Sequence, residues 1–438
     1  MTGRLHVRLE CYSGGSDPGL LTTVVGNVYA LTPGNPSQRQ VALPLGWETP
    51  PTVFDLPAGR YLVEASLPSG QILSEDVGVR DGQDVTVQLD LTESPYESHT
   101  MQYLVGNIEP SRVYHGRESY PMPNSLGSRG FTRHDPRTDD PNAAQPQARV
   151  AMLPRAEPAP LSFEKLNGLR ESRPLDAARS VEDLLGGPGK PAAMLPSDGD
   201  LLSPIFRLDA HTMENMPDFL GDAHLYQYLT ATAPDDAYLI TVPWPWRGSR
   251  GSTIAIEVLL NLRQGPTGSA VSVAVRDPAV GAGLGYLSSG SLEKAAVVLT
   301  DIESMLYSKV SNPLAAAAGG YVLIGTESSG KPQQWDKWLA NLREWFPYLS
   351  DGAILWGARR LRTAKTQSQV DEARHALLEG YGRGLPVYTL GLTWLIDGLS
   401  VFPDDPECAA ALQQVRQLCW RVDMREPFVV LRLGTTDD

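Results

Sequence analysis

Residues 335–346 read WDKWLANLREWF, and this stretch decides how the second half of the chain folds. Its large apolar side chains recur at steps of three and four residues, which places them along one stripe of an α-helix. Working outward, the pattern predicts a buried helix over residues 313–325 and further helices over 354–361, 370–381, 385–399 and 406–422. Because their connections are short, we expect antiparallel neighbours, in a helical bundle or a short helical-repeat stack.

The first hundred residues show a different period. Val85, Val87 and Leu89 alternate with polar residues, and residues 61–67 alternate in the same way. A period of two is typical of strands with one buried face. Turn signals at 67–70 and 81–84 have the spacing of a small antiparallel sandwich. The sequence therefore predicts a β-sandwich domain over residues 1–105.

One hairpin of this region resembles a known family. Residues 54–64, FDLPAGRYLVE, resemble the L-P-x-G-x-Y-x-V hairpin of carboxypeptidase-regulatory-like and PEGA-like modules. The resemblance implies a transthyretin-like β-sandwich that serves as a spacer or a binding domain. It implies no catalytic residue.

Residues 106–200 are rich in proline and arginine. Proline removes a backbone donor and disfavours helix at the residue before it, and large apolar side chains are few. We expect a flexible linker here, with short helices at 162–170 and 174–185; an ordered arm across a neighbouring domain is the alternative. Arginines in an exposed linker would offer processing sites to a peptidase, and the candidates are Arg129, Arg133, Arg137, Arg149 and Arg155.

Beyond the linker, β-branched runs at 238–242, 254–260 and 270–275 predict a small second sheet. We place this second β-rich domain at residues 201–290 and a helical domain at 291–425. A terminal strand and tail follow at 426–438. The expected fold class is therefore multidomain α+β, with a sandwich, a linker, a small sheet domain and a helical domain in that order.

Composition excludes several classes of function. The 438 residues include 37 Lys+Arg and 51 Asp+Glu, for a net charge of −14, which disfavours binding of nucleic acid by the whole surface. Three cysteines in this length suit a reducing compartment, so we expect the cytoplasm. The apolar run at 313–325 is shorter than the ~20 residues of a bilayer-spanning helix, and we expect no membrane association.

Two glycine motifs have simple structural explanations. Residues 325–331, GTESSGK, satisfy G-x-x-x-x-G-K, but Pro332 follows the lysine where a phosphate-binding loop has a hydroxyl. We expect a solvated loop between helices, with Pro332 at the first helical position. Residues 281–286, GAGLGY, resemble a dinucleotide fingerprint, but Tyr286 replaces its last glycine.

No constellation of catalytic or metal-binding residues emerges from the spacing. No two histidines lie three to five residues apart, and C-x-x-C is missing. Cys408 and Cys419 fall on one buried stripe of a helix, which predicts packing rather than nucleophilic catalysis. The densest acidic cluster is interpreted as a solvated loop edge and comprises Glu214, Asp218, Asp222 and His224. The sequence predicts no catalytic residue, no cofactor and no metal.

These observations favour a non-enzymatic cytoplasmic adaptor that binds protein partners through its terminal domains. Tryptophan and arginine anchor many protein interfaces, and Arg359, Arg360 and Arg362 are the candidate partner surface. Residues 335–342 (W-x-x-W-L-x-N-L) and 346–353 (F-P-x-L-x-D-G-A) resemble uncharacterised bacterial proteins associated with caspase-like peptidases. That resemblance implies an alternative: a substrate or effector of such a peptidase in a defence system, cleaved in the linker. An unrecognised hydrolase or nucleotide-binding enzyme is the third hypothesis.

Overall fold

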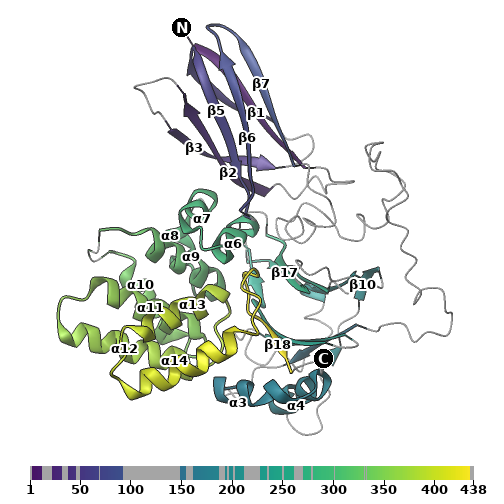
Figure 1. The fold of residues 1–438 in the computed structure, drawn as a ribbon, viewed down its shortest axis with the longest axis vertical. Coiled ribbons are helices and arrows are strands. Elements are labelled where there is room, and N and C mark those ends of the chain that lie inside the picture. The colour runs from purple at the N-terminus through teal and green to yellow at the C-terminus, as the bar shows by residue number, and fades with distance from the viewer. Residues whose placement is uncertain are drawn as a thin grey trace, which may run out of the picture.

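The computed structural model has the expected multidomain α+β layout: an N-terminal β domain, two smaller sheets and a run of C-terminal helices (Figure 1). It describes residues 2–11, 22–31, 38–45, 50–68, 70–91, 148–153, 161–186, 193–194, 197–200, 203–211, 227–233, 236–248, 251–260, 270–277, 280–299, 301–329, 331 and 333–434.

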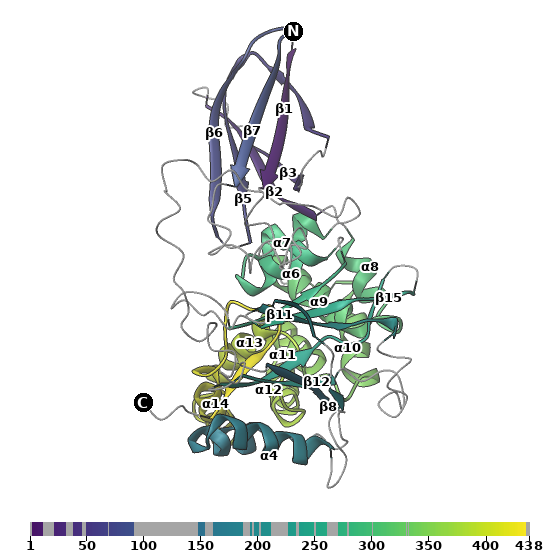
Figure 2. The ribbon, with the colours of Figure 1, turned by 90° about the vertical axis from the view of Figure 1, so that its right-hand side faces the viewer.

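The N-terminal domain is a seven-stranded sheet. Its strands are β1 (Thr2–Cys11), β2 (Thr22–Ala30), β3 (Gln38–Leu45), β4 (Thr52–Pro57), β5 (Gly59–Ser66), β6 (Ile72–Val79) and β7 (Asp84–Leu91). The order is β4-β1-β3-β2-β5-β6, and β7 pairs with β1 in parallel. Strands β6 and β7 are joined by one turn, but β6 pairs with β5 and β7 pairs with β1. The sheet therefore curves around its core (Figure 2).

The alternation in sequence sets which face of each strand is buried. Along β5, Tyr61, Val63 and Ala65 are at most 5% exposed, as the period of two predicts. The Tyr61 hydroxyl donates to the Pro57 carbonyl oxygen at 2.7 Å and closes the β4–β5 turn. The pattern therefore lies at a tight connection and not in the expected hairpin, because β4 pairs with β1 whereas β5 pairs with β2 and β6.

Two further sheets lie beside the helices. Five strands pair in the order β18-β13-β12-β8-β9, which are Val430–Leu433, Ala237–Val242, Gln227–Thr232, Arg149–Leu153 and Ala193–Met194. Four pair in the order β10-β11-β16-β17, which are Ser197–Asp200, Ser203–Leu208, Ile256–Leu260 and Val271–Val275. A short ribbon joins β14 (Trp246–Arg247) to β15 (Thr253–Ile254). The sequence predicted one sheet here, but the predicted strands divide between two.

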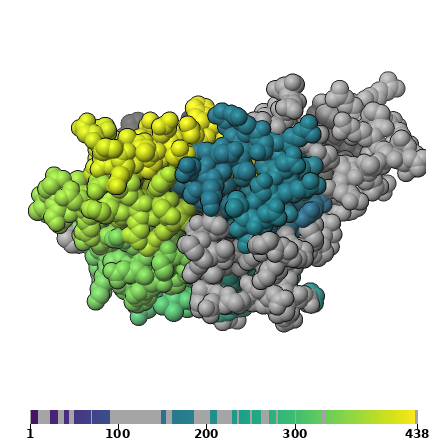
Figure 3. Space-filling model, turned by 90° about the horizontal axis from the view of Figure 1, so that it is seen from below, coloured from purple at the N-terminus to yellow at the C-terminus, as the bar shows by residue number. Residues whose placement is uncertain are grey.

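Part of the predicted linker belongs to the folded body, which corrects that prediction for residues 149–153 and 161–186. Strand β8 pairs with β12, and α4 (Pro174–Gly186) contacts β12, β13 and β18. Helix α3 (Phe163–Gly168) packs on α14, and the adjoining 3-10 turn is η2 (Leu169–Glu171). Seen from below, these helices lie against the C-terminal segment (Figure 3). The apolar stripe that includes Ala177, Ala178 and Val181 buries enough surface to order this part.

The C-terminal helices are α6 (Gly281–Ser288), α7 (Leu292–Val298), α8 (Ile302–Tyr307), α9 (Pro313–Thr326), α10 (Asp336–Trp345), α11 (Ser350–Thr363), α12 (Gln367–Gly382), α13 (Thr389–Ser400) and α14 (Pro406–Cys419). Helix α6 lies in a segment predicted to be β-rich. Its residues 281–287 are all buried, so no polar face reveals a helical period. Among the described helices, none is both long and apolar enough to cross a membrane.

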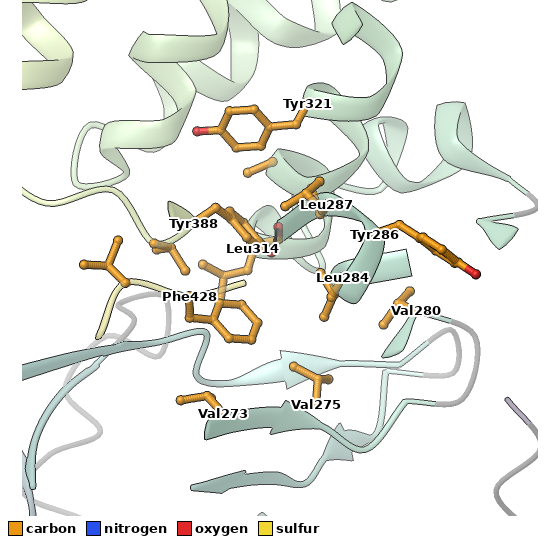
Figure 4. Close-up of a cluster of buried hydrophobic side chains, with 14 of the residues drawn as sticks. Val273, Val275, Val280, Leu284, Tyr286, Leu287, Leu314, Tyr321, Tyr388 and Phe428 are labelled. Atoms are coloured by element: carbon orange, nitrogen blue, oxygen red, sulfur yellow. Dashed lines mark hydrogen bonds between the residues drawn. The ribbon is translucent and has the colours of Figure 1, made fainter. Parts of the chain in front are cut away.

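Helix α6 joins the β domain to the rest of the molecule. In Figure 4 the Tyr286 side chain points away from Tyr321 and Tyr388. Its hydroxyl accepts from the Val25 backbone N–H at 3.0 Å and donates to the Ser66 carbonyl, which connects it to β2 and β5. A Cβ on Gly285 would lie 2.8 Å from Cβ of Pro68, so the close approach requires glycine. The β domain therefore packs directly on the helices.

Candidate functional site

The partner surface predicted on α11 includes Arg359, but the structure buries this residue. Its side chain is 1% exposed and lies between the loop after α9 and the start of α10. Its guanidinium donates to Glu327 Oε2 at 2.9 Å, Asp336 Oδ1 at 2.7 Å and the Lys331 carbonyl oxygen at 2.6 Å. The Trp335 ring lies 4.5 Å away and completes the enclosure. Arg359 therefore holds the α9–α10 connection and cannot anchor a partner.

The other two predicted arginines are also used within the domain. Arg360 pairs with Glu372 at 3.1 Å and lies 4.3 Å from the Trp356 ring. Arg362 donates to the Ile324 carbonyl and lies 5.0 Å from the Trp394 ring. Each of the three α11 arginines thus covers its own tryptophan. The tryptophans were expected to be core or interface residues, and here each ring forms a cation–π contact with an arginine.

The G-x-x-x-x-G-K segment is the loop fixed by Arg359. Gly325 and Thr326 end α9, and the Glu327 carboxylate accepts from the Ser329 N–H at 2.6 Å and from Arg359. A bound phosphate would need the backbone N–H groups of this loop, but the Ser329 N–H already donates to Glu327. The loop instead closes on itself, in agreement with a helix–helix connection.

The candidate processing arginines are divided by the structure. Arg149 begins β8, pairs with Glu182 of α4 at 3.1 Å and is half-exposed. A peptidase would have to open the five-stranded sheet to accept this residue in an extended conformation. Arg129, Arg133, Arg137 and Arg155 lie outside the described residues, and cleavage there stays a prediction.

The cysteines of α14 have the chemistry of packing residues. Cys408 is buried, and burial raises the pKa of its thiol to about 11, with the Asp405 carboxylate adding to the rise. Burial also raises the pKa of Cys419 to about 11. Raised values suppress the nucleophilic thiolate. The cluster of Glu214, Asp218, Asp222 and His224 lies outside the described residues, and the residues that are described contain no group of three or more potential metal ligands.

A buried carboxylate stands at the centre of the helical domain. Asp351 of α11 is 0% exposed and accepts from the Val387 N–H at 2.7 Å, the Tyr388 N–H at 3.3 Å and the Tyr321 hydroxyl at 2.9 Å. Burial raises its pKa to about 6, although these three donors act in the opposite direction. A Cβ on Gly391 would lie 2.6 Å from the Tyr321 hydroxyl oxygen.

This arrangement positions backbone rather than substrate. The Tyr388 hydroxyl donates to the Leu314 carbonyl oxygen at 2.7 Å, so one network joins α9, α11 and the segment before α13. Burial raises the pKa of both Tyr321 and Tyr388 well above the ordinary value. A fully enclosed carboxylate that accepts hydrogen bonds from three protein donors has a structural role in a helical core.

The groups around Arg359 and Asp351 and the two α14 cysteines belong to the run from α6 to α14. Residues 282–430 match the family model of the Y4kD C-terminal domain. The match begins inside α6 and ends at the first residue of β18, so this Y4kD-like region contains the helices described above. No curated protein and no solved structure matches the chain. The carboxypeptidase-regulatory-like or PEGA-like character of the N-terminal segment gains no support from these comparisons and stays a prediction.

The Y4kD-like region carries an unusually apolar surface at α8 and α10. Tyr307 and Val310 are 65% exposed, and Trp345 is 54% exposed. The Tyr307 ring meets the partly buried Trp338 ring edge-on, with centroids 5.2 Å apart. Trp338 and Trp345 are two turns apart on α10, and the two helices occupy the outer flank of the domain (Figure 1). We call Tyr307, Val310, Trp338 and Trp345 the aromatic corner.

Lys309 lies at this corner, between α8 and α9. Its side chain is 4% exposed, and its Nζ lies 5.2 Å from the centroid of the Trp345 ring. Burial lowers the pKa of its ammonium group. The sequence did not indicate these residues, because Tyr307 ends a short helix without a distinct period and Val310 follows it. Trp345 was found, but its stripe position predicted burial.

Proposed function

We propose that this chain is a non-catalytic adaptor that binds a protein partner through the aromatic corner of its helical domain. The supporting observation is the simultaneous exposure of Tyr307, Val310 and Trp345, each more than half accessible, on neighbouring elements. Single exposed apolar residues are ordinary in folded proteins, but a contiguous group marks an interaction surface. Aromatic rings are the residues that dominate binding energy in protein interfaces.

The way these rings are held also favours binding. Tyr307 packs on Trp338, and Trp345 covers Lys309, so the exposed rings have fixed neighbours on the domain. Fixed side chains lose little conformational entropy when a partner arrives. The corner is therefore preorganised for contact. The proposal moves the partner surface from the α11 arginines, which are occupied, to α8 and α10.

Capture of partners from the host by the purified full chain tests the proposal, using Trp345→Ala and Trp420→Ala as a matched pair. Trp420 is 91% exposed directly after α14, so its removal changes an exposed tryptophan without touching the corner. We expect the wild-type chain and Trp420→Ala to enrich the same protein, identified by mass spectrometry. Trp345→Ala should lose it. Equal capture by both variants, or enrichment of no protein by the wild-type chain, would contradict the proposal.

A further inference from the structure

The Lys309 side chain is largely buried at the aromatic corner, but its Nζ is not fully enclosed, and within the described residues it has no anionic partner. Within the described residues, the Lys309 ammonium forms neither a hydrogen bond nor an ion pair, and its recorded contact is the face of Trp345. Burying an ammonium group is unfavourable unless an opposite charge or several acceptors compensate. A cation–π contact offsets only part of that cost. In the part of the chain that the structure describes, only this aromatic contact therefore compensates the charge of Lys309.

The acidic side chains on neighbouring elements form no ion pair with Lys309 within the described residues, and Glu303, the closest of them in sequence, is exposed. Asp301 caps α8 by accepting from the Ser304 N–H at 3.2 Å, and Asp336 is paired with Arg359. Glu344, beside Trp345, is exposed and forms no recorded ion pair with Lys309. An anion brought by another molecule would complete the site.

We propose that the aromatic corner binds an acidic peptide segment of a protein partner. A carboxylate of that segment pairs with Lys309 Nζ, and an adjacent apolar side chain packs on Tyr307 and Trp345. This inference rests on the proposed adaptor function and names the chemistry of the partner. The charge of Lys309 selects the acidic residue, and the exposed rings select its apolar neighbour.

A peptide fits the surface better than a small anion does. A free carboxylate would neutralise Lys309 but leave Tyr307 and Val310, each 65% exposed, uncovered. A segment of several residues covers both features at once, and burial of apolar surface adds to the charge-assisted contact. Binding is therefore expected to weaken with salt and also to need a large apolar residue.

The test is selection of a displayed random-peptide library on the immobilised full chain. We expect enriched peptides to carry Asp or Glu within two residues of an aromatic or large aliphatic residue. The most enriched peptide is then synthesised, labelled and titrated in solution. Lys309→Met should weaken its binding about tenfold or more, because a charge-assisted contact is lost. Lys309→Arg should keep most of the affinity, Trp345→Ala should lose it, and Trp420→Ala should leave it unchanged.

Three outcomes overturn the inference: enrichment of no peptide, enrichment of peptides without acidic residues, or binding that survives Lys309→Met. The thermal unfolding of each variant is measured alongside, and Lys309→Met should unfold no earlier than the wild-type chain. The adaptor function is contradicted by a different result, namely that Trp345→Ala does not reduce the capture of any host protein. A captured protein that binds independently of Lys309 would keep the adaptor function and reject the acidic segment.

Discussion

Arg359 and Lys309 are both buried cations beside a tryptophan, and they differ in everything else. Arg359 is 1% exposed with two carboxylates and a carbonyl oxygen around it, whereas Lys309 is 4% exposed with one aromatic face. A buried charge whose partners are all present is part of the structure. Lys309 has no carboxylate partner within the described residues, and the proposed acidic segment would supply one. The exposed fraction does not distinguish Arg359 from Lys309, but the hydrogen-bond and ion-pair partners of each side chain do.

The largest effect is expected from Arg359→Met. This substitution leaves the Glu327 and Asp336 carboxylates facing each other in a partly buried site. Unfolding by urea should show a loss of about 3–5 kcal/mol, because one partner of a buried ion pair is removed. Arg416→Met is the matched control, since Arg416 is exposed on α14 and should change stability by less than about 0.5 kcal/mol. Equal effects of the two substitutions would break the comparison.

Asp351→Asn extends the comparison to a buried anion. The amide places donors where Val387, Tyr388 and Tyr321 already donate, so we expect a loss of about 2 kcal/mol near pH 6. The pKa of Asp351 in the folded protein is raised to about 6 from 3.8, so its protonated form is the stabilising one. That stability is complete below about pH 4 and is lost as pH rises through 6.

The raised pKa of Asp351 also predicts how the stability difference between wild type and Asp351→Asn changes with pH. Wild-type stability relative to Asp351→Asn should therefore be greater at pH 5.5 than at pH 7.5, by about 0.8 kcal/mol. Urea unfolding of both proteins at the two pH values measures it. A difference that grows with rising pH would mean that the three donors outweigh burial.

Tyr286→Phe probes a neutral buried group with both partners present. Loss of the hydroxyl deprives the Val25 N–H of an acceptor and the Ser66 carbonyl of a donor, at a cost of about 1 kcal/mol. Hydrogen exchange should become faster at Val25 and at the end of the β2–β5 ladder. Tyr307→Phe changes an exposed hydroxyl and serves as the control. Unchanged exchange at Val25 would show that packing alone holds the β domain on α6.

The smallest effect is expected from Lys309→Met. Removing a buried charge without an anion should change the free energy of unfolding by less than about 1 kcal/mol, or increase it. Urea unfolding beside Arg359→Met measures the contrast directly. A loss as large as that of Arg359→Met would reveal a hidden structural partner of Lys309.

The sequence predicted local structure better than it predicted contacts. Periods of two and 3.6 located β5, β7, α10, α12 and α14, because the buried positions of each element recur along one face. The α11 helix was located only over 354–361, and its residues 350–357 are all buried. The same reasoning failed at α6, whose residues 281–287 are all buried, and at β8, whose short apolar run lies in a proline-rich context. Periodicity carries no signal where both faces are covered.

The site was harder to predict for a different reason. Three arginines close together in sequence suggested an exposed basic face, yet Arg359 is enclosed by groups that follow α9 and begin α10. Conversely, Lys309 is a single lysine in a short connection, and its burial depends on α10, more than 25 residues away. Sequence shows which charges exist, but only tertiary packing shows which of them are neutralised.

The position of Tyr286 has a practical consequence for any shortened version of the chain. A fragment limited to residues 282–430 would keep the helices but lose the two strands that satisfy this phenol, and it would also lose β13 and all of β18 after Val430. Newly uncovered apolar surface favours aggregation. The boundaries of the sequence family therefore do not coincide with those of a self-sufficient folding unit, and expression trials should retain the preceding strands.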